Sequence, residues 1–138
     1  MAQLLDTSVF IAIEMGQLTL DQVTARLPDD DTALAALTAS ELLAGVYQAE
    51  PGPRREQRSV FVERALATFP VLAFDLPAAR IHARAAAEMR RTGQTIGSHD
   101  LVIAATALAN GYGVATLDAR GFPLVPDLRV TVLQLPEQ

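Results

Sequence analysis

Short apolar segments alternate with longer helical segments along the whole chain, and this alternation limits the possible folds more than any other feature. Strands that are separated by helices lie parallel in one sheet, and the connecting helices cover its faces. No internal repeat or linker divides the chain, so we expect one α/β domain over residues 1–138 with a mostly parallel sheet. The pattern predicts strands over residues 3–5, 33–37, 71–74, 113–116 and, at an edge of the sheet, 129–135.

The helical segments begin near residues that can cap a helix. Thr7 or Ser8 suits the start of the first helix, and Ser98 suits the start of the last. Thr38 and Glu41 have the spacing of a capping box. The body of the last helix is apolar almost all round, which predicts that it is deeply buried. Helices are accordingly expected from residue 7 or 8 to 15, and over residues 19–27, 38–50, 54–68, 77–91 and 98–110.

The composition excludes several classes of site. The chain contains no cysteine, which rules out disulfides, thiolate-bound zinc and cysteine nucleophiles. All 11 basic residues are arginine, and without lysine there is no P-loop, Schiff-base or protein-kinase site. The formal charge of -5 argues against binding to nucleic acid by overall attraction. Neither a membrane-length apolar run nor a signal peptide is recognisable, so we expect a cytoplasmic protein that does not enter a membrane.

Four acidic residues occupy equivalent places in the predicted fold. Asp6 ends the first strand and Asp118 follows the fourth, while Glu41 and Asp100 lie in the first turns of helices. All four positions map to the carboxyl edge of a parallel sheet, where open α/β sheets bind their ligands. Carboxylates gathered there need a compensating charge, and a hard divalent cation such as Mg²⁺ or Mn²⁺ supplies it.

Each acid also has an ordinary structural explanation. Asp6 suits a helix cap, and Asp118 suits a turn. Glu41 and Asp100 suit the positive end of a helix dipole. The joint occurrence of four acids at one edge favours a metal site over four unrelated explanations.

Short motifs surround these acids. The most specific is the run Asp-Leu-Val-Ile-Ala-Ala-Thr-Ala-Leu over residues 100–108, and shorter motifs cover residues 4–9, 39–45 and 114–118. Together they resemble the PIN-domain ribonucleases, in particular the VapC toxins of bacterial type II toxin–antitoxin pairs. The resemblance extends from Leu4 to about Val132. It implies a Rossmann-like α/β/α sandwich and metal-dependent cleavage of single-stranded or loop RNA.

The resemblance also implies a role for each site residue. Asp6, Glu41, Asp100 and Asp118 match the acidic site of the family. Asp6, Asp100 and Asp118 would bind Mg²⁺, for which Mn²⁺ can substitute, and a bound metal lowers the pKa of a water. Glu41 would hold or deprotonate that water. Small hydroxyl residues match the family's supporting groups, which orient carboxylates or waters: Thr7, Ser8 and Thr116.

One motif departs from the family pattern. Many relatives read Thr-x-Asn-x-x-Asp-Phe, whereas residues 116–122 read Thr-Leu-Asp-Ala-Arg-Gly-Phe. Asp118 therefore occupies the asparagine position, and Gly121 stands at the position of the later aspartate. The total of four acids is kept, and the number of metal ions stays open.

The resemblance further implies partners. A cognate VapB-like antitoxin would lay a segment across the site, with its Arg or Lys meeting the carboxylates, and the toxin would form a homodimer. The densest basic patch offers candidate RNA contacts, with a solvated helix face as the alternative: Arg54, Arg55 and Arg58. The two histidines, His82 and His99, have no useful mutual spacing.

Three other functions remain open at this point. A haloacid-dehalogenase-like phosphatase would need a second aspartate two residues after Asp6, but Ser8 stands there. A PIN scaffold that binds RNA or a partner without cutting is the main alternative, and metal-dependent cleavage of an RNA panel separates it from the nuclease. A nuclease acting on structured DNA is the third, and a comparison of DNA and RNA substrates decides it.

Overall fold

The computed structural model describes residues 2–27 and 31–137, and within them all strand pairings are parallel, as the alternation predicts. The five strands lie in the order β3-β2-β1-β4-β5. The chain adds β2 and β3 on one side of β1 and then crosses to the other side for β4, so β1 and β4 flank a topological switch point. The strands are β1 (Ala2–Leu5), β2 (Asp31–Ala35), β3 (Val71–Leu72), β4 (Gly113–Thr116) and the edge strand β5 (Val130–Val132).

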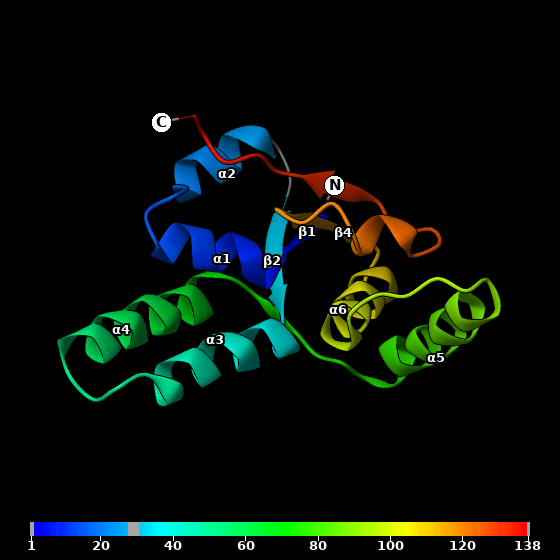
Figure 1. Ribbon diagram of the computed structural model, residues 1–138, viewed down its shortest axis with the longest axis horizontal. Helices are drawn as coiled ribbons and strands as arrows, with labels where there is room; N and C mark the ends of the chain where they lie inside the picture. Colours follow the sequence, from blue (N-terminus) through cyan, green and yellow to red (C-terminus); the bar gives the residue numbers. More distant parts are fainter. Residues whose placement is uncertain (1, 28–30, 138) are drawn as a thin grey trace.

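Helices cover both faces of the sheet, which confirms the predicted α/β/α sandwich. Figure 1 shows α1 to α4 on one side of the strands and α5 and α6 on the other. α6 is buried at residue 101 and over residues 103–107, as its apolar body predicts. The helices are α1 (Thr7–Glu14), α2 (Leu20–Arg26), α3 (Ala36–Gln48), α4 (Pro53–Thr68), α5 (Leu76–Arg91) and α6 (Ser98–Ala109), with a 3-10 turn at Phe122–Leu124.

The core has two parts because neighbouring strand residues face opposite ways. Leu5 and Ala115 pack into the cluster that includes Val9, Leu42 and Val62. Their strand neighbours Leu4 and Val114 pack instead into a cluster with Ile103 and Phe122. Both faces of β1 and β4 are therefore buried.

Two predicted N-caps are wrong, although α1 begins at residue 7 and α6 at residue 98 as predicted. Asp6 caps α1 instead of Thr7 or Ser8, and its side chain accepts from the backbone N–H of Thr7. α6 begins directly after Gly97, and Ser98 is its first residue and makes no cap. Thr7 and Ser98 are the first residues of their helices and Ser8 is the second, so each lies one or two positions after the N-cap.

The predicted capping box of Thr38 and Glu41 does not form. α3 begins at Ala36, immediately after β2, and the residue at its N-cap, Ala35, makes no side-chain cap. Thr38 is fully buried inside α3 and accepts a hydrogen bond from the Thr7 hydroxyl at 3.2 Å. Glu41 consequently lies in the second turn of α3 and not in the first. The spacing of Thr38 and Glu41 brings both side chains to Thr7 in α1, and neither caps α3.

Several strand limits also differ from the prediction. β2 ends at Ala35 because α3 starts there, and β3 and β5 are shorter than the segments predicted for them. In the described part of the chain, no helix combines the length and the apolarity needed to cross a bilayer.

Candidate active site

Asp6 lies where β1 ends, and neutral donors fix its carboxylate. Its backbone N–H donates to the Ala115 carbonyl at 2.9 Å, which continues the pairing of β1 with β4. Oδ1 accepts from the backbone N–H of Thr7 at 2.7 Å. Oδ2 accepts from the hydroxyls of Ser8 and Thr116, each at 2.8 Å. The residue is only 5% exposed, so a buried carboxylate is held in one orientation by three hydrogen bonds from uncharged groups.

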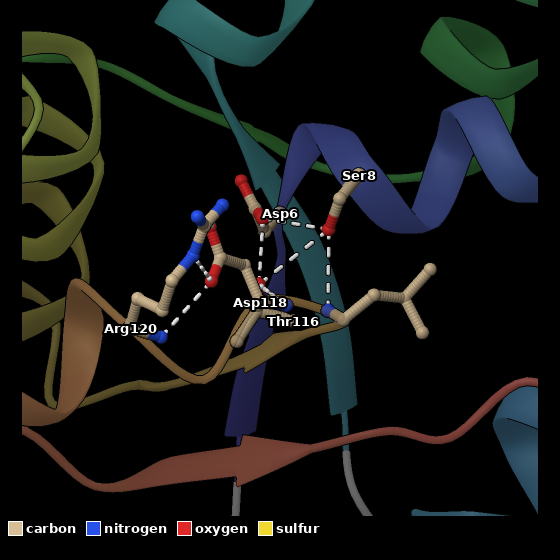
Figure 2. A network of polar contacts seen from close by, with 6 residues as sticks. Asp6, Ser8, Thr116, Asp118 and Arg120 are labelled. Carbon is tan, nitrogen blue, oxygen red and sulfur yellow. Dashed lines mark hydrogen bonds and ion pairs between the residues drawn. The ribbon is translucent and has the colours of Figure 1, made fainter.

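The hydroxyls of Ser8 and Thr116 join α1 to the end of β4. Ser8 Oγ accepts from the Leu117 backbone N–H at 3.2 Å, and Thr116 Oγ1 accepts from the Asp118 backbone N–H at 3.0 Å. Figure 2 shows these two side chains between Asp6 and the chain that leads to Asp118. These two hydroxyls thus contact both the Asp6 carboxylate and the backbone before Asp118, and their supporting role stays a prediction.

Glu41 approaches the same edge from α3. Its Oε1 accepts from the hydroxyl of Thr7 at 2.7 Å. Its Oε2 lies 3.3 Å from Nδ1 of His99, a side chain that is 62% exposed. Thr7 therefore contacts Glu41 directly, and its predicted supporting role stays a prediction. The contact with His99 was not predicted, because a single histidine before Asp100 carries no signal about a partner in α3.

Asp100 lies in the first turn of α6 and has the most perturbed carboxyl of the site. Partial burial raises its pKa, and the neighbouring charges of Asp6, Glu41 and Asp118 raise it further, to about 6, with a small opposing effect from His99. This is electrostatic evidence that the four predicted acids gather at one place. Their mutual repulsion is the situation that a bound cation would relieve.

Two glycines keep one oxygen of Asp100 open. A Cβ atom added to either Gly97 or Gly121 would stand 3.6 Å from Asp100 Oδ2. At Gly121 the added atom would also stand 3.1 Å from Cγ1 of Ile96. The position that carries a later aspartate in the family pattern therefore adjoins Asp100, and in this chain it leaves space there.

Asp118 differs from the other acids because an arginine pairs with it. Oδ1 accepts from the backbone N–H and from Nε of Arg120, at 2.9 and 3.0 Å, and Oδ2 accepts from Nη2 at 3.3 Å. These hydrogen bonds lower the pKa of the Asp118 carboxyl. Arg120 was not among the predicted site residues. An aspartate followed two residues later by an arginine, after a strand, is a local signal that could have indicated the pair.

A surface pocket of about 430 Å³ adjoins this end of the site. Its lining includes Arg120 and two of the acids. The lining residues are Thr95, Ile96, Gly97, Asp100, Asp118, Arg120 and Gly121. A second pocket of about 170 Å³ lies on the Glu41 side, between α1, α3 and α4. The acids thus have solvent-accessible space on both sides, as a site for a polymer would require.

The donor chemistry fits a hard divalent cation. Asp6, Glu41 and Asp100 supply carboxylate oxygens, and none of them pairs with an arginine in the described residues. The raised pKa of Asp100 shows that negative charge at this place is not neutralised. In the same residues no three acidic or imidazole side chains converge closely enough to form a closed metal cage. The predicted ligand set of Asp6, Asp100 and Asp118 therefore stays a prediction.

The three arginines of the predicted basic patch have different surroundings. Arg58 donates from Nε to Oε1 of Glu14 at 2.7 Å and lines the smaller pocket together with Glu41. Arg55 lies over the ring of Tyr47, 5.9 Å from its centroid, and Arg54 is exposed in the first turn of α4. Only Arg58 borders the space next to the acids, and the RNA-binding role of all three stays a prediction.

Comparisons with known proteins agree with this geometry. The profile of the PIN domain family matches residues 4–128. A protein named "Ribonuclease VapC" from Rickettsia bellii is 31% identical over 137 residues, which cover 99% of this chain and 100% of that protein. The structure of VapBC-5 from Mycobacterium tuberculosis, a member of the VapBC family of toxin-antitoxin systems, matches with a TM-score of 0.76 and 31% identity over 97% of this chain and 98% of that one. VapBC2 from Rickettsia felis, solved bound to a promoter DNA fragment, shares the fold with a TM-score of 0.86 at 20% identity, over 97% and 100% of the two chains.

Proposed function

Because the chain belongs to the PIN domain family, we propose that it is the toxin of a VapBC-type toxin–antitoxin pair, an endoribonuclease that hydrolyses phosphodiester bonds in RNA. The observation that carries this proposal is the buried Asp6 carboxylate, fixed by neutral donors beside the repelling charge of Asp100. An ordinary helix cap needs one hydrogen bond, and it needs no acidic neighbours. This arrangement favours catalysis over a scaffold that only binds.

The proposed cofactor is Mg²⁺, with Mn²⁺ as a substitute. Asp6, Asp100 and Asp118 would hold it, since carboxylate oxygens are the ligands that these ions prefer. A cation bound there would lower the pKa of a water and stabilise charge on the phosphate. Asp6 is the proposed principal ligand because its orientation does not depend on the metal.

Glu41 is proposed to take the proton of the attacking water. Thr7 anchors Oε1, so Oε2 is the oxygen that turns toward the exposed side, where it also meets His99. Ser8 and Thr116 do not touch substrate in this scheme. They hold Asp6 and the backbone of Asp118 in place, which keeps the distances between the acids constant during the reaction.

The proposed partner is a small VapB-like antitoxin, and the proposed place of action is the cytoplasm, where RNA is found. The antitoxin would silence the site by bringing an Arg or Lys to the carboxylates, since a charge-assisted pair would neutralise them as a cation does. A homodimer is proposed as well. The antitoxin partner is supported by the similarity to VapBC-5, which is a member of the VapBC family of toxin-antitoxin systems.

Cleavage of RNA by the purified chain tests the proposal. Asp6→Asn and Asp100→Asn should fold, by circular dichroism and thermal melting, and should lose at least about 100-fold in cleavage of total RNA with Mg²⁺. EDTA should abolish the activity of the unmodified chain. Arg129→Gln is the control, because Arg129 precedes β5 at the opposite end of the sheet and is exposed. Metal-dependent cleavage retained in both acid variants, or cleavage of DNA in preference to RNA, would contradict the proposal.

A further inference from the structure

Arg120 pairs with both carboxylate oxygens of Asp118. One edge of the guanidinium donates from Nε to Oδ1 at 3.0 Å and from Nη2 to Oδ2 at 3.3 Å, and the backbone N–H adds a bond of 2.9 Å to Oδ1. Figure 2 shows the two side chains lying against each other. Both oxygens of a proposed metal ligand are therefore engaged by a cation of the protein itself.

The pair is nevertheless open to exchange. The side chain of Arg120 is 90% exposed and that of Asp118 is 39% exposed. Exposed ion pairs contribute little to stability, because water and salt compete for both partners. A divalent cation can therefore replace the guanidinium at Asp118 at small cost.

The guanidinium also borders the space where a substrate would lie. Arg120 is the one arginine in the lining of the 430 Å³ pocket, which it shares with Asp100 and the backbone around Gly97. Guanidinium groups bind phosphate through two parallel N–H bonds, and the Nη1 edge of Arg120 makes no hydrogen bond within the described residues. The same side chain can thus face either a carboxylate or a phosphate.

We propose that Arg120 is a latch that exchanges Asp118 for an RNA phosphate when a divalent cation binds at Asp118. Without the cation, Arg120 neutralises Asp118; with it, the released guanidinium contacts a phosphate in the pocket. The latch rests on the proposed function, because it assumes that cation and RNA meet at this site. It adds a residue that couples the two binding events, and Arg120 acts as a positioning residue for Asp118 until it is released.

The first test measures binding of Mn²⁺ alone by calorimetry. Arg120→Gln should bind Mn²⁺ roughly three- to fivefold more tightly, because the competing cation is gone. Arg120→Lys should lie between the two, since an ammonium lacks the planar fork. The charge-matched Arg129→Gln should equal the unmodified chain. Equal Mn²⁺ affinity in Arg120→Gln and Arg129→Gln would overturn the latch.

The second test measures binding of a labelled single-stranded RNA in EDTA, where cleavage does not interfere. Asp118→Asn frees Arg120 and should tighten RNA binding, whereas the same change in an Arg120→Gln background should have much less effect. In the Asp118→Asn background, where Arg120 is free, Arg120→Gln should also lower the slope of log affinity against log salt by about 0.7, the value for one phosphate contact on a single strand. Additive effects of the two substitutions would mean that only net charge matters, and the latch would be wrong.

These outcomes separate the latch from the proposed function. If the unmodified chain neither binds Mn²⁺ nor cuts RNA, the nuclease proposal fails, and the RNA cycle in EDTA still decides whether Asp118 restrains Arg120. If cleavage and Mn²⁺ binding are normal and the cycle is additive, only the latch fails.

Discussion

The two ends of the acidic site hold their carboxylates in opposite ways. Asp6 is buried and receives its hydrogen bonds from two hydroxyls and a backbone N–H. Asp118 is partly exposed and receives its hydrogen bonds from an arginine two residues away. Neutral donors keep the negative charge available for a ligand, whereas the arginine cancels it. The Asp6 carboxylate is thus already oriented and not neutralised by a cationic side chain of the described residues, whereas Asp118 must first lose its ion pair with Arg120.

Among the substitutions that test this difference between Asp6 and Asp118, loss of the buried Thr116 hydroxyl should have the largest effect on stability and cleavage. Thr116→Val keeps the shape but leaves Asp6 Oδ2 with one donor and the Asp118 N–H without its acceptor. We expect a loss of about 1–3 kcal/mol in the free energy of unfolding and a fall in cleavage of about tenfold. Urea denaturation and initial cleavage rates measure the two quantities.

A buried threonine elsewhere provides the matched control. Thr106 is also almost fully buried, and its hydroxyl donates at 2.9 Å to the Val102 carbonyl of its own helix. Thr106→Val should cost less stability than Thr116→Val and leave cleavage unchanged. Equal losses in the two variants would mean that the hydroxyl of Thr116 has no special part in holding Asp6.

Asp100 carries charge that no cationic side chain in the described part of the chain neutralises, and this charge should make the stability of the protein depend on pH. The folded pKa of Asp100, about 6, is above the ordinary value of 3.8, so the folded state binds the proton more tightly than the unfolded state. Stability in EDTA should therefore fall as pH rises from about 4 through 6. Asp100→Asn removes this penalty and should raise the melting temperature at pH 7 by on the order of 2 °C.

The pH dependence makes the Asp100 experiment specific. The gain should vanish as the pH falls well below the ordinary pKa of 3.8, where Asp100 is protonated in both states, and Mg²⁺ should stabilise the unmodified chain more than the variant. A gain of the same size at every pH would point to altered packing and not to charge.

The smallest effect is expected at the exposed contact of His99 with Glu41. Because His99 is 62% exposed and Thr7 still holds the other oxygen of Glu41, His99→Gln should change cleavage by less than about twofold. Thr7→Val, which removes the 2.7 Å bond, should cost more. A larger loss in His99→Gln than in Thr7→Val would show that the histidine contacts the RNA itself.

Sequence reasoning located the acids well because they follow strand ends. Asp6 and Asp118 come directly after or close behind apolar strands, and parallel topology brings such positions together. The family resemblance and the sandwich were confirmed by the profile match and the fold. The roles assigned to the acids and hydroxyls stay predictions.

The predicted capping box failed because both of its residues have a distant partner. Thr38 and Glu41 show the spacing of a capping box, yet the partner of both is Thr7, which lies more than 30 residues earlier in the chain. Local spacing does not reveal which distant group a side chain will meet. The ion pair of Arg120 with Asp118 was missed for a different reason. The contact is local, but only Asp118 was considered as a candidate site residue.

The bond between Thr116 and Asp6 also has a consequence for synthesis. It joins groups 110 positions apart in the sequence, and it requires β4 to be inserted beside β1. A ribosome that has made only the first three strands has therefore made no finished site, because Thr116, whose hydroxyl fixes Asp6, has not yet been synthesised. The order of elements in the chain delays the appearance of a potentially harmful activity until nearly the whole protein, and with it the surface for a neutralising partner, exists.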